Sequence, residues 1–122
     1  MDNILTEKII GAAIEVHRYW GPGLLERIYE ESLIHELMLR GVATTTQVSL
    51  NLRYKDLQLG QDSRIDIIAQ NKVIVELKSV TEIVAIHEAQ LLTYMKLSGL
   101  RIGLIINFNT LKLKDGIKRL VL

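Results

Sequence analysis

Two acidic side chains stand on neighbouring segments that both have the texture of β-strands. Asp66 lies in RIDIIA (64–69), Glu76 lies in VIVELK (73–78), and Lys78 follows Glu76 on the same side of its strand. The short segment between them has an ordinary length for a β-hairpin loop. Two carboxylates and a lysine on one sheet face could hold a divalent cation beside a positive charge, a combination suited to phosphate chemistry.

The alternation of apolar residues predicts how the two strands align. The apolar faces contain Ile65, Ile67 and Ala69 in the first strand and Val73, Val75 and Leu77 in the second. Bringing these faces together pairs 69 with 73, 67 with 75 and 65 with 77, and it sets Asp66 opposite Glu76 on the other face. Opposed carboxylates destabilise a strand pair unless a positive group lies between them. A divalent cation is the simplest candidate, because Mg²⁺ needs only one or two carboxylates plus water and phosphate oxygens.

An alternative is that both acids lie on a solvated sheet face, where they pair with Lys78 and Arg64. Ile68 and Ile74 share that face, however, so we expect part of it to be covered. Acids on a half-buried face need a compensating partner. The spacing therefore favours a metal site but leaves the solvated patch open.

Length and composition limit the fold class and the partners. With 122 residues, 48% of them hydrophobic, the chain is expected to form one globular domain over 1–122. A net charge of +1 argues against a protein that holds nucleic acid by bulk charge, and the absence of cysteine excludes disulfides and thiolate metal sites. The longest uncharged stretch, 102–110, is too short to span a bilayer. The first residues lack a signal-peptide pattern, so we expect a cytoplasmic protein with no membrane partner.

The remaining segments supply the elements that must position the acid pair. Apolar spacing predicts helices over 4–19, 24–40 and 86–98. Alternation predicts strands over 44–54, 64–69, 73–78, 102–108 and 117–122, with a short return strand over 56–60. The apolar stripe of the second helix is expected to contain Leu25, Ile28, Leu33 and Leu37. The order α-α-β-β-β-β-α-β-β favours an α/β fold in which helices flank a mixed central sheet, with 102–108 beside 73–78 through a right-handed crossover.

Three stretches together resemble one protein family. Asp66 followed by Glu76-Leu77-Lys78 resembles the D…E-x-K core of the PD-(D/E)XK nuclease superfamily. GLLERIY (23–29) is similar to the signature of the GxxExxY family. HEAQLLTYMKLSGLRIGLIINF (87–108) looks like that family's glutamine-containing helix and the strand after it. The resemblance covers about residues 5–120 and implies a restriction-endonuclease-like fold, with nuclease activity inferred from the superfamily.

The resemblance also implies roles for the residues of the strand pair. Asp66 would be the central metal ligand and Glu76 the second. The carbonyl of Leu77 would contribute a third oxygen. Lys78 would position the attacking water or offset charge in the transition state.

Two helices would complete the site. The resemblance places Glu26 at the helical acid that faces the metal, although an acid in the first turn is also favoured by the helix dipole alone. Gln90 and Tyr94 fit the family's Q…Y pair, and their spacing puts them on one helix face; they could also mark the edge of an apolar stripe. His87 is expected to be a solvated helix-start residue, and Tyr29 a core residue with its hydroxyl at the rim.

These observations predict a Mg²⁺- or Mn²⁺-dependent nuclease that hydrolyses phosphodiester bonds of nucleic acid, with DNA as the expected substrate. The alternative is a catalytically inert or partner-dependent module that binds nucleic acid or regulates on the same fold. Because the chain is short and its net charge is near zero, target recognition is expected to come from a homodimer or a partner protein.

Overall fold

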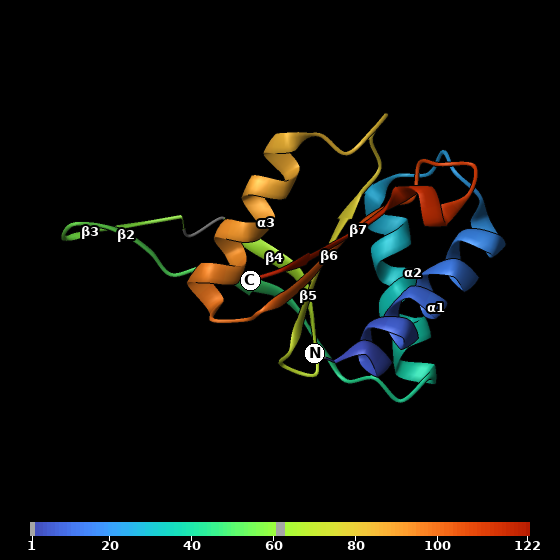
Figure 1. The fold of residues 1–122 in the computed structure, drawn as a ribbon, viewed down its shortest axis with the longest axis horizontal. Helices are drawn as coiled ribbons and strands as arrows, with labels where there is room; N and C mark the ends of the chain where they lie inside the picture. The colour runs from blue at the N-terminus through green and yellow to red at the C-terminus, as the bar shows by residue number, and fades with distance from the viewer. Residues whose placement is uncertain (1, 61–62) are drawn as a thin grey trace.

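The computed structural model describes residues 2–60 and 63–122. Its elements, in order, are α1 (Asn3–Trp20), α2 (Glu26–Leu39), β1 (Thr44–Ser49), β2 (Leu52–Tyr54), β3 (Leu57–Leu59), β4 (Arg64–Ala69), β5 (Val73–Lys78), α3 (Ala85–Ser98), β6 (Ile102–Asn107), a 3-10 turn η1 (Leu113–Gly116) and β7 (Ile117–Val121). This is the order that the sequence predicts, with η1 added. Helices α1 and α2 lie on one side of the main sheet and α3 on the other (Figure 1).

The main sheet is mixed and has the strand order β1-β4-β5-β6-β7. Its neighbouring strands are antiparallel except for β5 and β6, which run parallel and are connected through α3. The predicted placement of β6 beside β5 is therefore confirmed. The side chains of β6 are buried along the whole strand, as expected where helices cover both faces. The acid-bearing strands β4 and β5 lie inside the sheet, with β1 and β7 at its edges.

The sheet separates two apolar cores, one on each of its faces. The larger core joins α1 and α2 to one face and includes Ile67, Val75 and Leu77; the smaller core joins α3 to the other face and includes Ile68, Ile74 and Leu91. Ile65 belongs to the smaller core, so its predicted place beside Ile67 is wrong. The regular β4–β5 ladder stops at Ile67 and Val75, and the strict alternation of faces is lost beyond that point.

Strand 44–54, predicted as continuous, is broken after Ser49. Leu50 turns inward and donates its N–H to the carbonyl of Ser63, 3.2 Å away. The chain then forms β2 and β3, which pair with each other in a separate two-stranded sheet that projects away from the main body (Figure 1). The predicted return strand is thus present, as the second strand of a projecting hairpin.

The turn between α1 and α2 is fixed by Tyr29. This side chain is fully buried and stacks on Phe108, with ring centroids 4.5 Å apart. Its hydroxyl donates to the carbonyl of Gly21 and accepts the N–H of Leu24, so it is enclosed by the turn that it stabilises. The prediction that Leu25 joins the apolar stripe of α2 is wrong. This residue is 79% exposed, because it precedes the helix with an extended backbone and α2 begins at Glu26.

Helix α3 lies close against the sheet at Gly103 of β6. A methyl group there would come within 2.9 Å of Leu91 and of the Met95 sulfur, both of which are buried. The helix ends at Gly99, which adopts the left-handed conformation. No helix in the described ranges is long and apolar enough to cross a membrane.

Candidate active site

The two acids of the β4–β5 hairpin lie where the ladder between these strands stops. The recorded pairs are 67 with 75, 68 with 74 and 69 with 73, which is the predicted register. Beyond them, Glu76 Oε1 accepts the N–H of Asp66 at 3.0 Å, and Asp66 Oδ2 accepts the N–H of Leu77 at 2.9 Å. Each carboxylate therefore accepts a backbone hydrogen bond from the opposite strand, and the two acids are held side by side.

Burial makes this acid pair electrostatically costly. Glu76 is only 6% exposed, and burial, with the charge of Asp66 adding to it, raises its pKa from an ordinary 4.5 to about 8. Burial also raises the pKa of Asp66, against the opposing effects of the Leu77 N–H and of Lys78. Near neutral pH the pair therefore retains a proton, because a second charge is disfavoured in so enclosed a place.

The alternative of a solvated ion-pair patch is wrong for Glu76, because this side chain is buried. Within residues 2–60 and 63–122, side-chain ion pairs form between Arg40 and Glu36, Lys72 and Asp2, and Lys118 and Glu88, all away from the acid pair. Lys78 is a cationic side chain whose charge lowers the pKa of both acids. A buried and a half-buried carboxylate side by side favour a bound cation in addition.

Helix α2 points two further acids at the pair. Glu26 is its first residue, and burial and the charge of Asp66 raise its pKa while Lys78 lowers it. Glu30 lies one turn later, and burial raises its pKa, with Asp66 adding to the effect. The structure thus brings Glu26 towards the strand acids as expected. Glu30 was missed, although its spacing of four residues from Glu26 places both on one helix face.

Gln47 of β1 connects Glu30 to the strand acids and was also missed. Its Nε2 donates to Glu30 Oε2 at 2.9 Å and lies 3.2 Å from Oε1. A hydrogen bond from the same side chain lowers the pKa of Asp66. Gln47 has a φ of 51°, the left-handed region that few residues with a Cβ adopt. Nothing in its sequence neighbourhood signals this backbone conformation.

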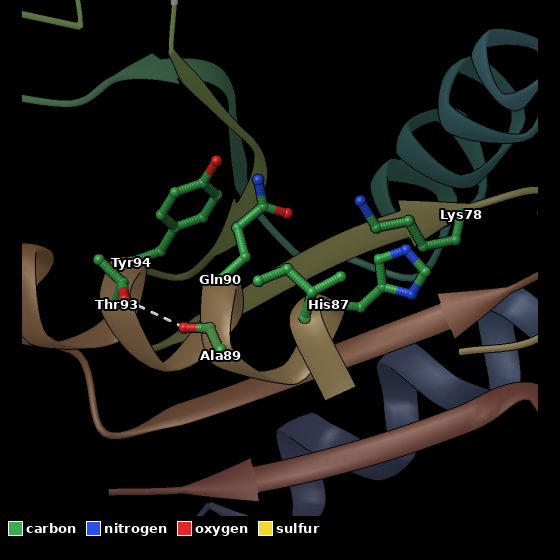
Figure 2. A pocket seen from close by; sticks show the side chains of 7 residues that line it. Lys78, His87, Ala89, Gln90, Thr93 and Tyr94 are labelled. Carbon is green, nitrogen blue, oxygen red and sulfur yellow. Dashed lines mark hydrogen bonds between the residues drawn. The ribbon is translucent and has the colours of Figure 1, made fainter. Parts of the chain in front are cut away.

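A cavity of about 530 Å³ opens between Lys78 of β5 and helix α3. It is lined by Lys78, Ile86, His87, Ala89, Gln90, Thr93 and Tyr94. Figure 2 shows Lys78 extending from β5 towards the residues of α3, with Gln90 and Tyr94 on the same side of that helix. Burial and the charges of Glu76 and Asp66 raise the pKa of Tyr94, against a hydrogen bond from Gln90. The predicted shared face of Gln90 and Tyr94 is therefore confirmed, and it borders the acid pair.

His87 has a structural partner in this cavity wall. Its Nδ1 accepts the N–H of Val84 at 3.0 Å, which satisfies an otherwise free amide at the start of α3. The side chain is half-buried rather than solvated. Its position at the start of the helix agrees with the sequence-based interpretation.

The donor set suits a hard divalent cation. Asp66 and Glu76 offer carboxylate oxygens, and Leu77 is held next to them by its bond to Asp66. In the part of the chain that the structure describes, no three His, Cys, Asp or Glu side chains converge as a metal site by themselves. Mg²⁺ does not require such a set, because it keeps several waters and binds one or two carboxylates together with substrate phosphates. The residues present therefore fit the metal that the sequence predicts.

Comparison with known proteins agrees with this geometry. A family model described as the PD-(D/E)XK nuclease superfamily matches residues 3–120, almost the entire chain. Searches of curated proteins and of solved structures gave no match. The mixed five-stranded sheet with flanking helices is consistent with that family's fold. The chain therefore belongs to the PD-(D/E)XK nuclease superfamily.

Proposed function

We propose that this chain is a Mg²⁺- or Mn²⁺-dependent nuclease that hydrolyses phosphodiester bonds of DNA. The observation that carries the proposal is the crossed arrangement of Asp66 and Glu76, each bonded to the backbone of the other's strand. This arrangement fixes a buried and a half-buried carboxylate next to each other. Membership of a nuclease superfamily supports the same chemistry.

Asp66, Glu76 and the Leu77 carbonyl would hold the cation. When bound, such an ion polarises the scissile phosphate and lowers the pKa of water at the site. Lys78 places a flexible ammonium group in the adjoining cavity, where it would stabilise the negative charge that develops on the phosphate oxygens. Its effect on the pKa of Glu26 indicates that it acts across the whole acidic site.

The residues on the two helices would orient the reacting groups. Glu26 faces the acid pair from α2 and would position water, because its carboxylate can accept a proton or a hydrogen bond. Gln90 and Tyr94 line the cavity beside Lys78 and would contact the substrate backbone with an amide and a hydroxyl. Both groups hydrogen-bond to phosphate oxygens without reading sequence.

The net charge of the chain indicates that it needs help to bind its target. A net charge of +1 gives little non-specific attraction to a polyanion. We therefore propose that residues 1–122 form one nuclease-like domain of the GxxExxY type. A second copy or a partner protein in the cytoplasm would supply target recognition.

A cleavage assay tests the proposal directly. Purified wild type, Asp66→Asn and Lys78→Met are incubated with labelled single- and double-stranded DNA and RNA, in Mg²⁺, Mn²⁺ or EDTA. Lys72→Met is the matched control, because Lys72 lies in the hairpin turn at the far end of the same strands and is exposed. We expect metal-dependent cleavage of DNA by wild type and Lys72→Met only.

Other outcomes would contradict parts of the proposal. Equal cleavage by all four proteins would identify a contaminating nuclease. Cleavage of RNA alone would overturn the substrate but retain the chemistry. Absence of cleavage by every protein, with the folded state intact by circular dichroism, would favour the inert or partner-dependent module.

A further inference from the structure

Gln47 interrupts an otherwise regular strand. Thr46 pairs with Ile67 and Val48 pairs with Ile65, so the register of β1 against β4 is the same on both sides of Gln47. No residue is inserted, and the departure from extended backbone is confined to Gln47, whose φ is 51°. This register makes Gln47 the β1 residue that faces Asp66. An isolated left-handed residue that is neither glycine nor asparagine persists only where its surroundings require it.

The contacts of the Gln47 side chain explain why its backbone adopts this conformation. Its amide nitrogen donates to Glu30 of α2, with the shorter distance 2.9 Å, and the register of β1 sets the residue opposite Asp66, whose pKa its side chain lowers. A glutamine amide carries two protons on its nitrogen and can serve two acceptors at once. Gln47 therefore lies between the carboxylate of Glu30, to which it is bonded, and the carboxylate of Asp66, at the exposed rim of the site.

Asp66 consequently has a polar neighbour on each side. The Leu77 N–H bonds to its Oδ2 from β5, and Gln47 lies opposite it in the register of β1 and lowers its pKa. A carboxylate that is bonded from one strand and flanked by an amide on the other is restricted in its rotation, so its remaining lone pairs face in a preferred direction. Groups that orient ligands in this way commonly affect metal affinity as strongly as some ligands do.

We propose that Gln47 is a positioning residue for the metal site, tied to Glu30 and aimed at Asp66. The inference rests on the proposed function, because it gives Asp66 the role of a ligand. Glu30 acts through Gln47: it anchors the amide and does not contact the cation. The left-handed backbone at Gln47 is the conformation that lets one side chain reach both acids.

The test measures Mn²⁺ binding by calorimetry on the full-length protein, together with urea unfolding. Gln47→Gly removes the side chain and also relieves the backbone, because glycine adopts positive φ readily. Gln70→Gly is the matched control: Gln70 is an exposed glutamine with a φ of 49°, in the β4–β5 turn. We expect neither variant to unfold at lower urea than wild type. Only Gln47→Gly should bind Mn²⁺ more weakly, by about 10- to 100-fold.

Two further variants test whether the length of the Gln47 side chain matters and whether Glu30 acts through it. Gln47→Asn keeps an amide and tolerates the left-handed backbone, but it is one methylene shorter and should weaken Mn²⁺ binding as Gln47→Gly does. Glu30→Ala should weaken binding in the wild-type background and have no further effect in Gln47→Gly.

The results distinguish the inference from the function on which it rests. Mn²⁺ binding by Gln47→Gly equal to that of Gln70→Gly would overturn the positioning role while leaving the metal site in place. Additive effects of Glu30→Ala and Gln47→Gly would overturn the link between these residues. A wild type that binds no Mn²⁺ and cleaves no nucleic acid would overturn both the function and the inference.

Discussion

Replacing Glu76 by glutamine should stabilise the metal-free protein at alkaline pH. Glutamine has the same shape, and its Oε1 can still accept the N–H of Asp66 that Glu76 binds at 3.0 Å. It lacks the charge that burial opposes. The variant therefore removes the electrostatic cost of the site and keeps its hydrogen bond.

The size of the effect follows from the pKa of Glu76, which burial and Asp66 raise to about 8 against an ordinary 4.5. A folded-state pKa above the unfolded value means that the folded protein holds the proton more tightly. The stability that the tighter proton binding of Glu76 contributes is therefore complete below about pH 4.5, and it is lost as pH rises towards about 8. Each pKa unit corresponds to about 1.4 kcal/mol, so the loss is on the order of 5 kcal/mol above pH 8 and about 3 kcal/mol at pH 7.

Urea unfolding followed by circular dichroism in EDTA measures this loss between about pH 5 and pH 9. Wild type should lose stability steadily across this range, whereas Glu76→Gln should retain most of it. The two proteins should agree at the acidic end. Glu7→Gln, at an exposed position on α1, is the matched control and should follow wild type throughout.

A Glu76→Gln profile with the same slope as wild type would refute the reasoning, because the titrating group would then lie elsewhere. A variant less stable than wild type at about pH 9 would also contradict it. That result would mean that ionised Glu76 is satisfied by the fold itself.

Three further outcomes are expected. Mn²⁺ affinity should rise by about tenfold per pH unit until the pKa of Glu76 is passed, because the ligand must release a proton; a flat calorimetric profile would contradict this. Gly103→Ala should lower the free energy of unfolding by about 1–3 kcal/mol, since its methyl group would lie 2.9 Å from the buried Leu91; unchanged urea unfolding would show that α3 can move. Tyr29→Phe should lose about 1–3 kcal/mol, because Gly21 and Leu24 lose their hydroxyl partner, and an unchanged unfolding midpoint would argue for water in its place.

The acid pair could be predicted from the sequence because its geometry depends on a local pattern. A short turn and the alternation of apolar residues fix the register of a hairpin, and that register brings Asp66 to Glu76. The Gln90–Tyr94 face is equally local, since it follows from helical spacing. Both predictions required no knowledge of how distant segments meet.

The rest of the site depends on packing between distant segments. Gln47 reaches Glu30 only because β1 adopts a left-handed residue, and no glycine or asparagine marks that position. Ile65 changed face because the ladder between its strand and β5 stops after Ile67. The alternation of apolar residues predicts which sheet face a side chain occupies only while the neighbouring strands remain paired. It does not indicate where that pairing stops.

The projecting β2–β3 hairpin lies between the two halves of the site along the chain. Everything before it contributes α2 and Gln47, and everything after it contributes Asp66 with the rest of β4, β5 and α3. The halves meet through the β1–β4 ladder, which is formed by strands outside the hairpin. The turn at Lys55 and Asp56 is therefore a natural point at which to divide the gene. Two co-expressed fragments would each lack half of the acids, so the site would form only when they reassemble, and metal binding or the proposed cleavage would report their association.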